Sequence, residues 1–279
     1  MATEDQHAKL ERLRAQLRGL KAAAVCFSGG VDSTFLLAVA QEVLGERAFA
    51  VTESNALYPQ RETDEAVAFC RQHGIAQLML SHSPADIEGF SANPRNRCYL
   101  CKRVLFAHVR KAADEHARSH GLIGADERVA CLEGSNATDR GDYRPGAQAV
   151  LELGMLSPLD CADLTKQDIR DLSHEMGLPT WEKPSFACLA TRFAYGESIA
   201  PELLRRVDSA EQLLIDAQLG QLRVRMHDHG TLARIEVAPD RIPDAFAYLT
   251  AEGKAKLHEL GFTHVSLDVD GYRTGSMNE

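Results

Sequence analysis

The chain has 279 residues, of which 31 are Lys or Arg and 40 are Asp or Glu, so its formal net charge is −9. This acidic balance disfavours a nucleic-acid partner, because an extended nucleic-acid footprint needs clustered positive charge. No apolar run reaches the length of a membrane span and the polar start MATEDQHAKLERLR differs from a secretory signal, so we expect a cytoplasmic protein with no membrane partner.

The first half of the chain alternates between predicted strands and helices. Residues 9–20 have the spacing of an amphipathic helix and lead into a short apolar strand at 23–27. Strand-helix alternation predicts βαβ units and a parallel sheet, in which ligands bind at the carboxyl ends of the strands. The further predicted elements are strands at 48–52, 76–80 and 129–133 and helices at 61–73 and 103–120.

The turn at residues 28–33, SGGVDS, lies between the first strand and a helical run that starts at Ser33. Its two glycines allow a close backbone approach, and the following helix presents unpaired N–H groups and the positive end of its dipole. The turn therefore predicts a phosphate site, although a plain strand-turn-helix with a good N-cap has a similar pattern. It is not a Walker loop, which requires Gly-x-x-x-x-Gly-Lys-[Ser/Thr].

Polar side chains follow two other predicted strands. Thr52 ends the second strand, and Ser135 and Asn136 follow the fourth. Because the carboxyl ends of parallel strands share one edge of a sheet, we expect these three residues to bind the nucleotide.

Three cysteines stand apart from the other four. Cys98 and Cys101 form a Cys-x-x-Cys pair flanked by basic residues, which would favour thiolates at a redox pair or a metal site; two incidental thiols remain an alternative. Arg192 follows Cys188 by one helical turn and would stabilise a thiolate or an anionic substrate, although a lone cysteine is more often structural. Cys26, Cys70 and Cys131 lie in apolar or helical runs that suit small buried side chains, and Cys161 is unassigned.

The segment from residue 140 to 146 is rich in turn-forming residues. It is either a solvated loop or a lid in which Asp142 and Arg144 contact the substrate.

The remainder of the chain changes in type, so we predict one domain over residues 1–195 and a smaller α+β domain over residues 196–279. Arg223 and Arg225 share one face of the first strand of a predicted antiparallel hairpin, and Arg234 lies on the matching face of the second strand. These arginines are either solvated or form a fork for a phosphate or carboxylate. The predicted elements are helices at 165–176, 201–219 and 251–260 and strands at 222–226, 233–237 and 265–267.

A family resemblance connects these motifs. SGGVDS resembles the PP-loop of ATP pyrophosphatases, which cleave ATP between its α and β phosphates. Together with RCYLCK, GSNATDRGDYRPG, KPSFACLATR, LRVR and DGYRTGSMN, in this order over nearly the whole chain, it resembles the LarE family of ATP-dependent sulfur transferases. The resemblance implies a parallel-sheet PP-loop domain, a smaller α+β domain for substrate binding or oligomerisation, and a homo-oligomer. It also implies a nucleotide substrate, pyridinium-3,5-dicarboxylate mononucleotide, whose carboxylate is adenylated and converted to a thiocarboxylate for the nickel-pincer cofactor of lactate racemase.

The resemblance further implies the cofactors and the residues that bind them. ATP with Mg²⁺ would be bound by Ser28, Gly29, Gly30, Asp32 and Ser33, with Asp32 near the metal. Members with three cysteines resemble enzymes that hold a [4Fe–4S] cluster, here through Cys98, Cys101 and Cys188, whose open iron carries a sulfide from a donor. In other members the cysteine matching Cys188 is itself sacrificed as the sulfur source. Arg192, Arg223, Arg225 and Arg234 would position the anionic groups of the substrate.

Two other functions fit parts of the same pattern. A tRNA thiolase with a PP-loop also combines adenylation with a three-cysteine cluster, but the acidic balance disfavours it. A regulatory nucleotide-binding module would use the turn at residues 28–33 to bind a nucleotide but would have no turnover.

Overall fold

The computed structural model describes residues 2–141 and 145–273, which form two compact units. The first unit comprises Met1–Ser54, Gln60–His82 and Cys98–Phe186, and the second comprises Asn55–Pro59, Ser83–Arg97 and Ala187–Glu279. The division after Phe186 falls earlier than the predicted boundary at 195. Two short segments from the first half of the chain also join the second unit, because they pack with its residues through contacts such as Leu189 N–H to the Leu57 carbonyl, 2.8 Å.

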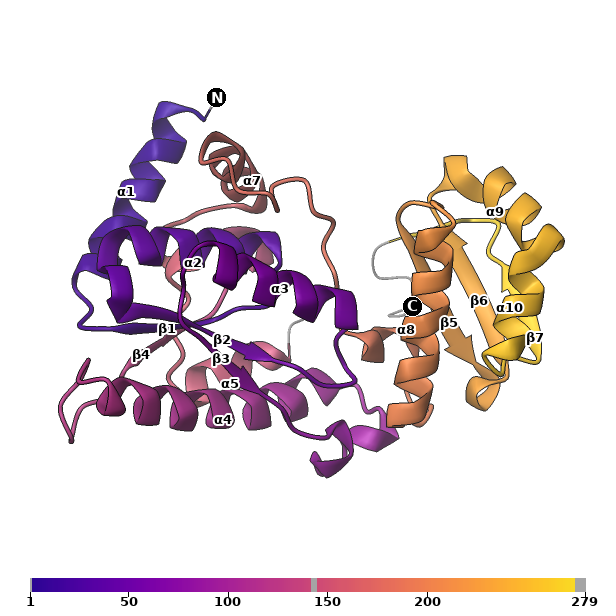
Figure 1. Ribbon diagram of the computed structural model, residues 1–279, viewed down its shortest axis with the longest axis horizontal. Helices are drawn as coiled ribbons and strands as arrows, with labels where there is room; N and C mark the ends of the chain where they lie inside the picture. The colour runs from indigo at the N-terminus through magenta and orange to yellow at the C-terminus, as the bar shows by residue number, and fades with distance from the viewer. Residues whose placement is uncertain (1, 142–144, 274–279) are drawn as a thin grey trace. The chain divides into compact units, whose positions relative to one another are not determined.

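The first unit is built on a parallel four-stranded sheet, as the strand-helix alternation predicts, so the α/β fold class is confirmed (Figure 1). The strand order is β3-β2-β1-β4, which places β1 at the centre, next to the point where the order reverses. The strands are β1 (Ala23–Cys26), β2 (Ala48–Glu53), β3 (Gln77–Leu80) and β4 (Ala130–Leu132).

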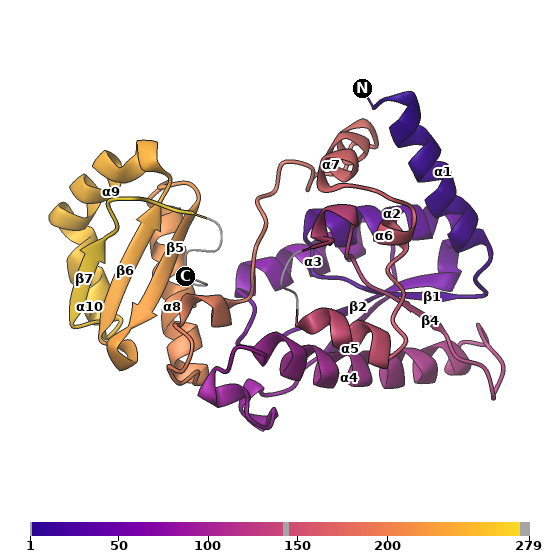
Figure 2. The ribbon, with the colours of Figure 1, turned by 180° about the vertical axis from the view of Figure 1, so that it is seen from behind.

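Helices cover both faces of this sheet. Helices α2 and α3 lie on one face and α4 and α5 on the other, as both ribbon views show (Figure 2). Each face has its own apolar core; the α2 side includes Leu13, Phe35 and Leu172, and the α4 side includes Phe49 and Phe106. The helices are α1 (Glu4–Arg18), α2 (Val31–Leu44), α3 (Gln60–Gln72), α4 (Arg97–Ser119), α5 (Gly146–Glu152), α6 (Pro158–Cys161) and α7 (Lys166–Glu175).

The second unit is a small α+β structure in which β5 and β6 form the predicted antiparallel hairpin. Strand β7 adds to β6 in a parallel orientation, and the sheet order is β5-β6-β7. The elements are α8 (Pro201–Asp216), β5 (Leu222–His227), β6 (Leu232–Val237), α9 (Ile242–Tyr248), α10 (Lys254–Glu259) and β7 (His264–Leu267).

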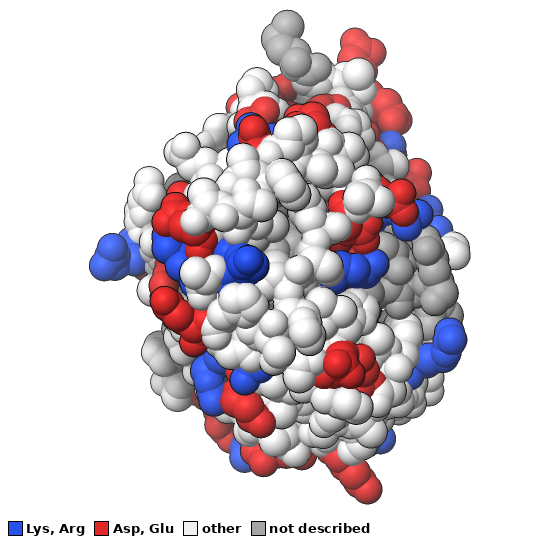
Figure 3. All heavy atoms as spheres, turned by 90° about the vertical axis from the view of Figure 1, so that its right-hand side faces the viewer, with Lys and Arg blue, Asp and Glu red and all other residues white. Residues whose placement is uncertain are grey.

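The charges on one face of the second unit are mixed in sign. Figure 3 shows this face, where acidic and basic side chains are interspersed among uncharged ones. None of the helices in the described residues is both long and apolar enough to cross a membrane.

Candidate active site around the PP-loop

The turn at residues 28–33 connects β1 to α2 in a conformation that exposes the helix N-terminus. Gly29 has φ +70°, which favours glycine, and Gly30 is the N-cap of α2 but offers no side chain to its N–H groups. The Ser33 hydroxyl donates to the Gly30 carbonyl at 3.1 Å and accepts from the Ser28 N–H at 3.3 Å. The serines thus hold the loop in shape while the positive end of the α2 dipole remains available to an anion.

The end of β4 lies against this loop, at the point where the strand order reverses. Asn136 donates from Nδ2 to Asp32 Oδ1 at 3.3 Å, and a Cβ added to Gly134 would lie 3.4 Å from the Asp32 Cβ. Open α/β sheets bind their ligands in the crevice at this point. Ser135, the third polar residue of this stretch, donates its hydroxyl to Glu133 at 2.9 Å.

Thr52, at the other side of β1, has a buried hydroxyl with two protein partners. It donates to the Phe27 carbonyl at 2.9 Å and accepts from Gln77 Nε2 at 2.8 Å. The first bond ties β2 to Phe27, the residue that precedes the PP-loop, and the second ties β2 to β3.

Two lysines that the sequence analysis did not single out reach the PP-loop. Lys166, the first residue of α7, places Nζ 2.5 Å from Asp32 Oδ2. Lys183 donates to the Gly29 carbonyl at 3.2 Å and pairs with Glu62 of α3 at 2.7 Å. A basic residue in the first turn of a helix is disfavoured by the helix dipole, so the position of Lys166 near the start of the helix predicted at 165–176 was the available signal.

Burial and ion pairing act in opposite directions on these groups. Burial raises the pKa of the Asp32 carboxyl, and the ammonium of Lys166 opposes that rise. For Lys183, burial lowers the pKa, but the carboxylates of Glu62 and Glu65 outweigh it and the pKa is raised. The charge states of these side chains beside the loop therefore depend on one another.

Cys98 and Cys101 lie in the first two turns of α4, which begins six residues earlier than the sequence predicts. Residues three apart on a helix share one face, so the two half-buried thiols face the same side. Thiols are the donors that iron–sulfur clusters use, so this pair fits part of the predicted ligand set. Cys188 belongs to the second unit, and within the described residues no group of three or more His, Cys, Asp or Glu side chains is arranged for a metal ion.

Of the three other cysteines that the sequence predicts to be small buried side chains, Cys70 and Cys131 are buried and Cys26 is half-buried. Burial raises the pKa of Cys70 to about 12 and that of Cys131 to about 11, and it raises the pKa of Cys26 still further. Thiols that resist ionisation are poor nucleophiles and poor ligands, which disfavours a catalytic or metal-binding role for these three cysteines.

Arg192 is fully buried and fixes the backbone next to Cys188. Its guanidinium forms a two-point pair with Glu211 of α8, with Nε–Oε1 and Nη2–Oε2 distances of 2.7 and 3.0 Å. It also donates to the carbonyls of Ala187 and Cys188 at 3.0 and 3.4 Å. Arg192 therefore orients the segment that carries Cys188.

The hairpin arginines do not lie on a solvated face: Arg223 and Arg225 are buried and Arg234 is half-buried, and the last two share an ionic network. Arg225 Nη2 pairs with Glu236 at 2.8 Å, and Arg234 bridges Glu236 and Asp268. Arg223 donates to the Leu222 carbonyl and lies 4.9 Å from the centroid of the Tyr272 ring. Burial lowers the pKa of Arg223, and nearby Arg192 adds to that effect.

Asp142 and Arg144, the predicted lid residues, lie outside the described residues.

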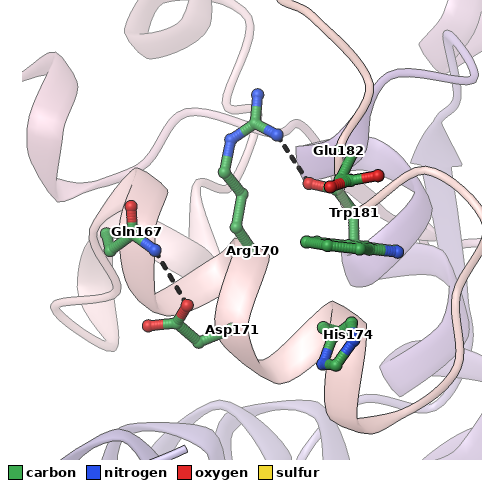
Figure 4. Close-up of a pocket in the computed structure, with 6 residues that line it drawn as sticks. All are labelled: Gln167, Arg170, Asp171, His174, Trp181 and Glu182. Atoms are coloured by element: carbon green, nitrogen blue, oxygen red, sulfur yellow. Dashed lines mark hydrogen bonds between the residues drawn. The ribbon is translucent and has the colours of Figure 1, made fainter.

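A cavity of about 550 Å³ lies along α7, and Figure 4 shows the side chain of Arg170 among the residues that line it. Arg170 donates to the carbonyls of Trp181 and Lys183, so it fixes the loop that carries Lys183. The lining residues, none of them a predicted site residue, are Gln167, Arg170, Asp171, His174, Trp181 and Glu182.

Comparisons with known proteins connect this geometry to a family. No family model matches the chain. It is 38% identical over 272 residues to an uncharacterized protein of Synechocystis, with 97% of each chain covered. It is 32% identical to the pyridinium-3,5-bisthiocarboxylic acid mononucleotide synthase of Lactiplantibacillus plantarum, covering 97% of this chain and 94% of the relative.

A partial similarity extends to another class of ATP-using enzyme. Over 181 residues the chain is 26% identical to the glutamine-hydrolyzing GMP synthase of a Ruegeria species. The aligned region covers 61% of this chain and 34% of that protein. Both similarities support an ATP-using enzyme with a PP-loop. The resemblance to the LarE family is thereby confirmed at the level of the family, and the chain belongs to the family of the pyridinium-3,5-bisthiocarboxylic acid mononucleotide synthases.

Proposed function

We propose that the protein is an ATP-dependent sulfur transferase that adenylates a carboxylate of pyridinium-3,5-dicarboxylate mononucleotide and converts it to a thiocarboxylate. The observation that carries this proposal is the similarity to the synthase of Lactiplantibacillus plantarum along 97% of the chain. The product would serve nickel-pincer nucleotide synthesis, and the working form would be a cytoplasmic homo-oligomer.

The first step forms an acyl adenylate. A carboxylate oxygen of the substrate attacks the α-phosphorus of ATP, the bond between the α-phosphorus and the bridging oxygen breaks, and pyrophosphate leaves with the electron pair. The first-turn N–H groups of α2 and the turn around Gly29 and Gly30 support this step, because preorganised donors stabilise the charge that grows on the leaving group. Asp32 and Asn136 would flank the phosphates, and Mg²⁺ would be held near Asp32, since Mg²⁺ is commonly bound by one carboxylate together with phosphate oxygens.

The second step replaces AMP by sulfur. A sulfur nucleophile attacks the acyl carbon, and the carbon–oxygen bond to AMP breaks. A [4Fe–4S] cluster bound by Cys98, Cys101 and Cys188 would supply sulfide to this step without consuming a residue. Arg192 would keep the Cys188 backbone in place, as its bonds to Glu211 and to the Cys188 carbonyl support.

The cysteine assignment is tested by purifying the protein without oxygen and measuring iron, sulfide and visible absorbance. We expect a brown protein, and we expect Cys98→Ala and Cys101→Ala to lose the colour. Cys161→Ala is the matched control, because Cys161 is exposed and lies outside the proposed ligand set. A fully coloured Cys98→Ala or Cys101→Ala variant would exclude that residue as a ligand.

Intact-mass spectrometry after turnover distinguishes the two possible roles of Cys188, a ligand of the cluster or a sacrificed source of sulfur. An unchanged chain with several products per subunit supports delivery from the cluster. Loss of the mass of H₂S from Cys188 would show instead that this residue is sacrificed, and it would contradict the cluster route.

A further inference from the structure

Two histidines lie side by side at the C-terminal end of α4. His116 is in the last turn of this helix, and the N–H of His120, the residue after Ser119, donates to the His116 carbonyl at 3.1 Å, so His120 continues the same turn. Residues four apart on a helix are neighbours on its surface. Accordingly, the centroids of the two imidazole rings are 4.0 Å apart, with an angle of 35° between the ring planes.

Hydrogen bonds determine which nitrogen of His120 can bind a ligand. Its Nδ1 lies 2.9 Å from the His116 carbonyl oxygen and 3.0 Å from the Ser119 hydroxyl, which donates its own hydrogen to the same carbonyl at 2.8 Å. A carbonyl oxygen can only accept, so we assign the hydrogen of the neutral imidazole to Nδ1. The lone pair of Nε2 then remains for a ligand. Histidines that bind metal ions commonly donate their other ring N–H to a carbonyl in this way.

His116 is held in place but keeps its ring nitrogens available. Its ring packs on the fully buried side chain of Phe49 in β2, at a centroid distance of 4.6 Å. Among residues 2–141 and 145–273, neither ring nitrogen of His116 has a hydrogen-bond partner. Burial lowers the pKa of His116, and nearby His120 adds to that effect. The neutral imidazole, which is the form that binds metal ions, is therefore favoured.

The electrostatics of this helix end also suit a cation. The last carbonyl groups of a helix carry the negative end of its dipole, which stabilises positive charge. Arg118, the arginine of this turn, donates to the carbonyls of Ala125 and Glu127, both at 3.0 Å. Its guanidinium therefore has acceptors of its own, which balance part of its charge.

We infer that His116 and His120 together bind a divalent transition-metal ion, with water in the remaining coordination positions. Imidazole is a ligand for Zn²⁺, Cu²⁺ and Ni²⁺, and two histidines four apart on one helix face are a known metal-binding arrangement. A rise of 1.5 Å per residue places His116 about 27 Å along α4 from Cys98, so this site is distinct from the cysteine pair. The inference does not depend on the proposed function.

The test is calorimetric titration of the protein with NiCl₂ in a buffer without chelators. The unmodified protein should bind one Ni²⁺ whose binding is lost or strongly weakened in His120→Ala, because only one of the two imidazoles remains. Removal of a group that merely supports a ligand typically costs 10–100-fold in metal affinity, so removal of a ligand should weaken this site by at least roughly 10-fold. Since His120 is exposed, its substitution should leave the fold intact.

His116→Ala is the second variant and should lose the same ion. His7→Ala is the matched control, because His7 belongs to the same unit but lies beside Glu175, 3.3 Å away; this variant should bind Ni²⁺ as the unmodified protein does. Any Ni²⁺ bound by cysteine thiols is common to all four proteins, so the comparison isolates the histidine pair. Undiminished Ni²⁺ binding by His120→Ala, or by a folded His116→Ala protein, would overturn the inference.

Discussion

Asp168 joins two helices of the first unit through a carboxylate that is largely buried. It accepts from Lys9 Nζ at 2.9 Å, from Gln6 Nε2 at 3.1 Å and from the Thr165 N–H at 2.9 Å. Burial alone would raise its pKa, but these hydrogen bonds outweigh burial and lower the pKa from 3.8 to about 2. The ionised form of Asp168 is therefore favoured in the folded state.

Replacing Asp168 by Asn should lower the free energy of unfolding by roughly 2 kcal/mol at pH 7, since one pKa unit corresponds to about 1.4 kcal/mol. Because the folded pKa is the lower one, this contribution is complete above the unfolded pKa and is lost as the pH falls towards 2. Urea unfolding from pH 7 to pH 2 measures it. Asp5→Asn, at an exposed partner of Lys9, should change little; a pH-independent difference for Asp168→Asn would contradict this explanation.

The Arg192–Glu211 pair is completely buried, so removal of one partner leaves an uncompensated charge. Arg192→Met should cost about 3–5 kcal/mol, measured by the shift of the urea midpoint. The double variant Arg192→Met with Glu211→Gln should recover part of the loss, because glutamine is neutral and still offers an oxygen to the Val224 N–H. A double variant that is as unstable as the sum of the two single variants would argue against a coupled pair.

At this scale, residue chemistry was predictable where it depends on neighbours in sequence. The predicted helix around Cys70 and the apolar run around Cys131 indicated buried thiols, which the structure has. The anion site at the turn 28–33 stays a prediction. The partners of Lys166 and Arg192 were not predictable, because Asp32 lies 134 residues from Lys166 and Glu211 lies 19 residues from Arg192 along the chain.

The strand-loop-helix element around the PP-loop depends on one glycine for two reasons. Gly29 has φ +70°, and a Cβ placed there would lie 3.3 Å from the Ala66 Cβ of α3. Gly45, which follows α2, has φ +58° and open space around it. Both glycines therefore need a positive φ, but only Gly29 lies in the PP-loop and has a close neighbour where a Cβ would be.

Alanine substitution at either glycine should cost on the order of 1–3 kcal/mol from the positive-φ backbone alone. Only Gly29→Ala should also weaken ATP binding, because only this residue shapes the phosphate-binding turn. Thermal unfolding and nucleotide titration on both variants measure the two effects separately. Equal loss of ATP affinity in Gly45→Ala would show that general destabilisation, rather than the loop, is responsible.

Most elements follow from local patterns, and the differences have physical causes. The hairpin of β5 and β6 and the helix α7 lie close to their predicted bounds, because their apolar spacing and their turn or cap residues agree. Helix α4 starts earlier than predicted. Residues 97–102 belong to the helix, but they lack the strong apolar period from which a helix is predicted. The burial of charged side chains in this hairpin was not foreseen, because Glu236 neutralises Arg225 only after β5 and β6 have paired.

For the whole molecule, the α/β class and the presence of a second unit were predictable from the change in pattern along the chain. The participation of Asn55–Pro59 and Ser83–Arg97 in the second unit was not, because it depends on tertiary contacts of segments that resemble loops in sequence. The absence of a nucleic-acid partner stays a prediction. Its basis is the net charge of −9.

The most direct test of the account is to incubate the protein with ATP, Mg²⁺ and pyridinium-3,5-dicarboxylate mononucleotide, and to follow both pyrophosphate and the mass of the acceptor. We predict that pyrophosphate appears only when the acceptor is present and that each equivalent accompanies the exchange of one carboxylate oxygen for sulfur. Pyrophosphate release that ignores the acceptor, or an acceptor whose mass is unchanged after ATP is consumed, would contradict the proposed sulfur transfer.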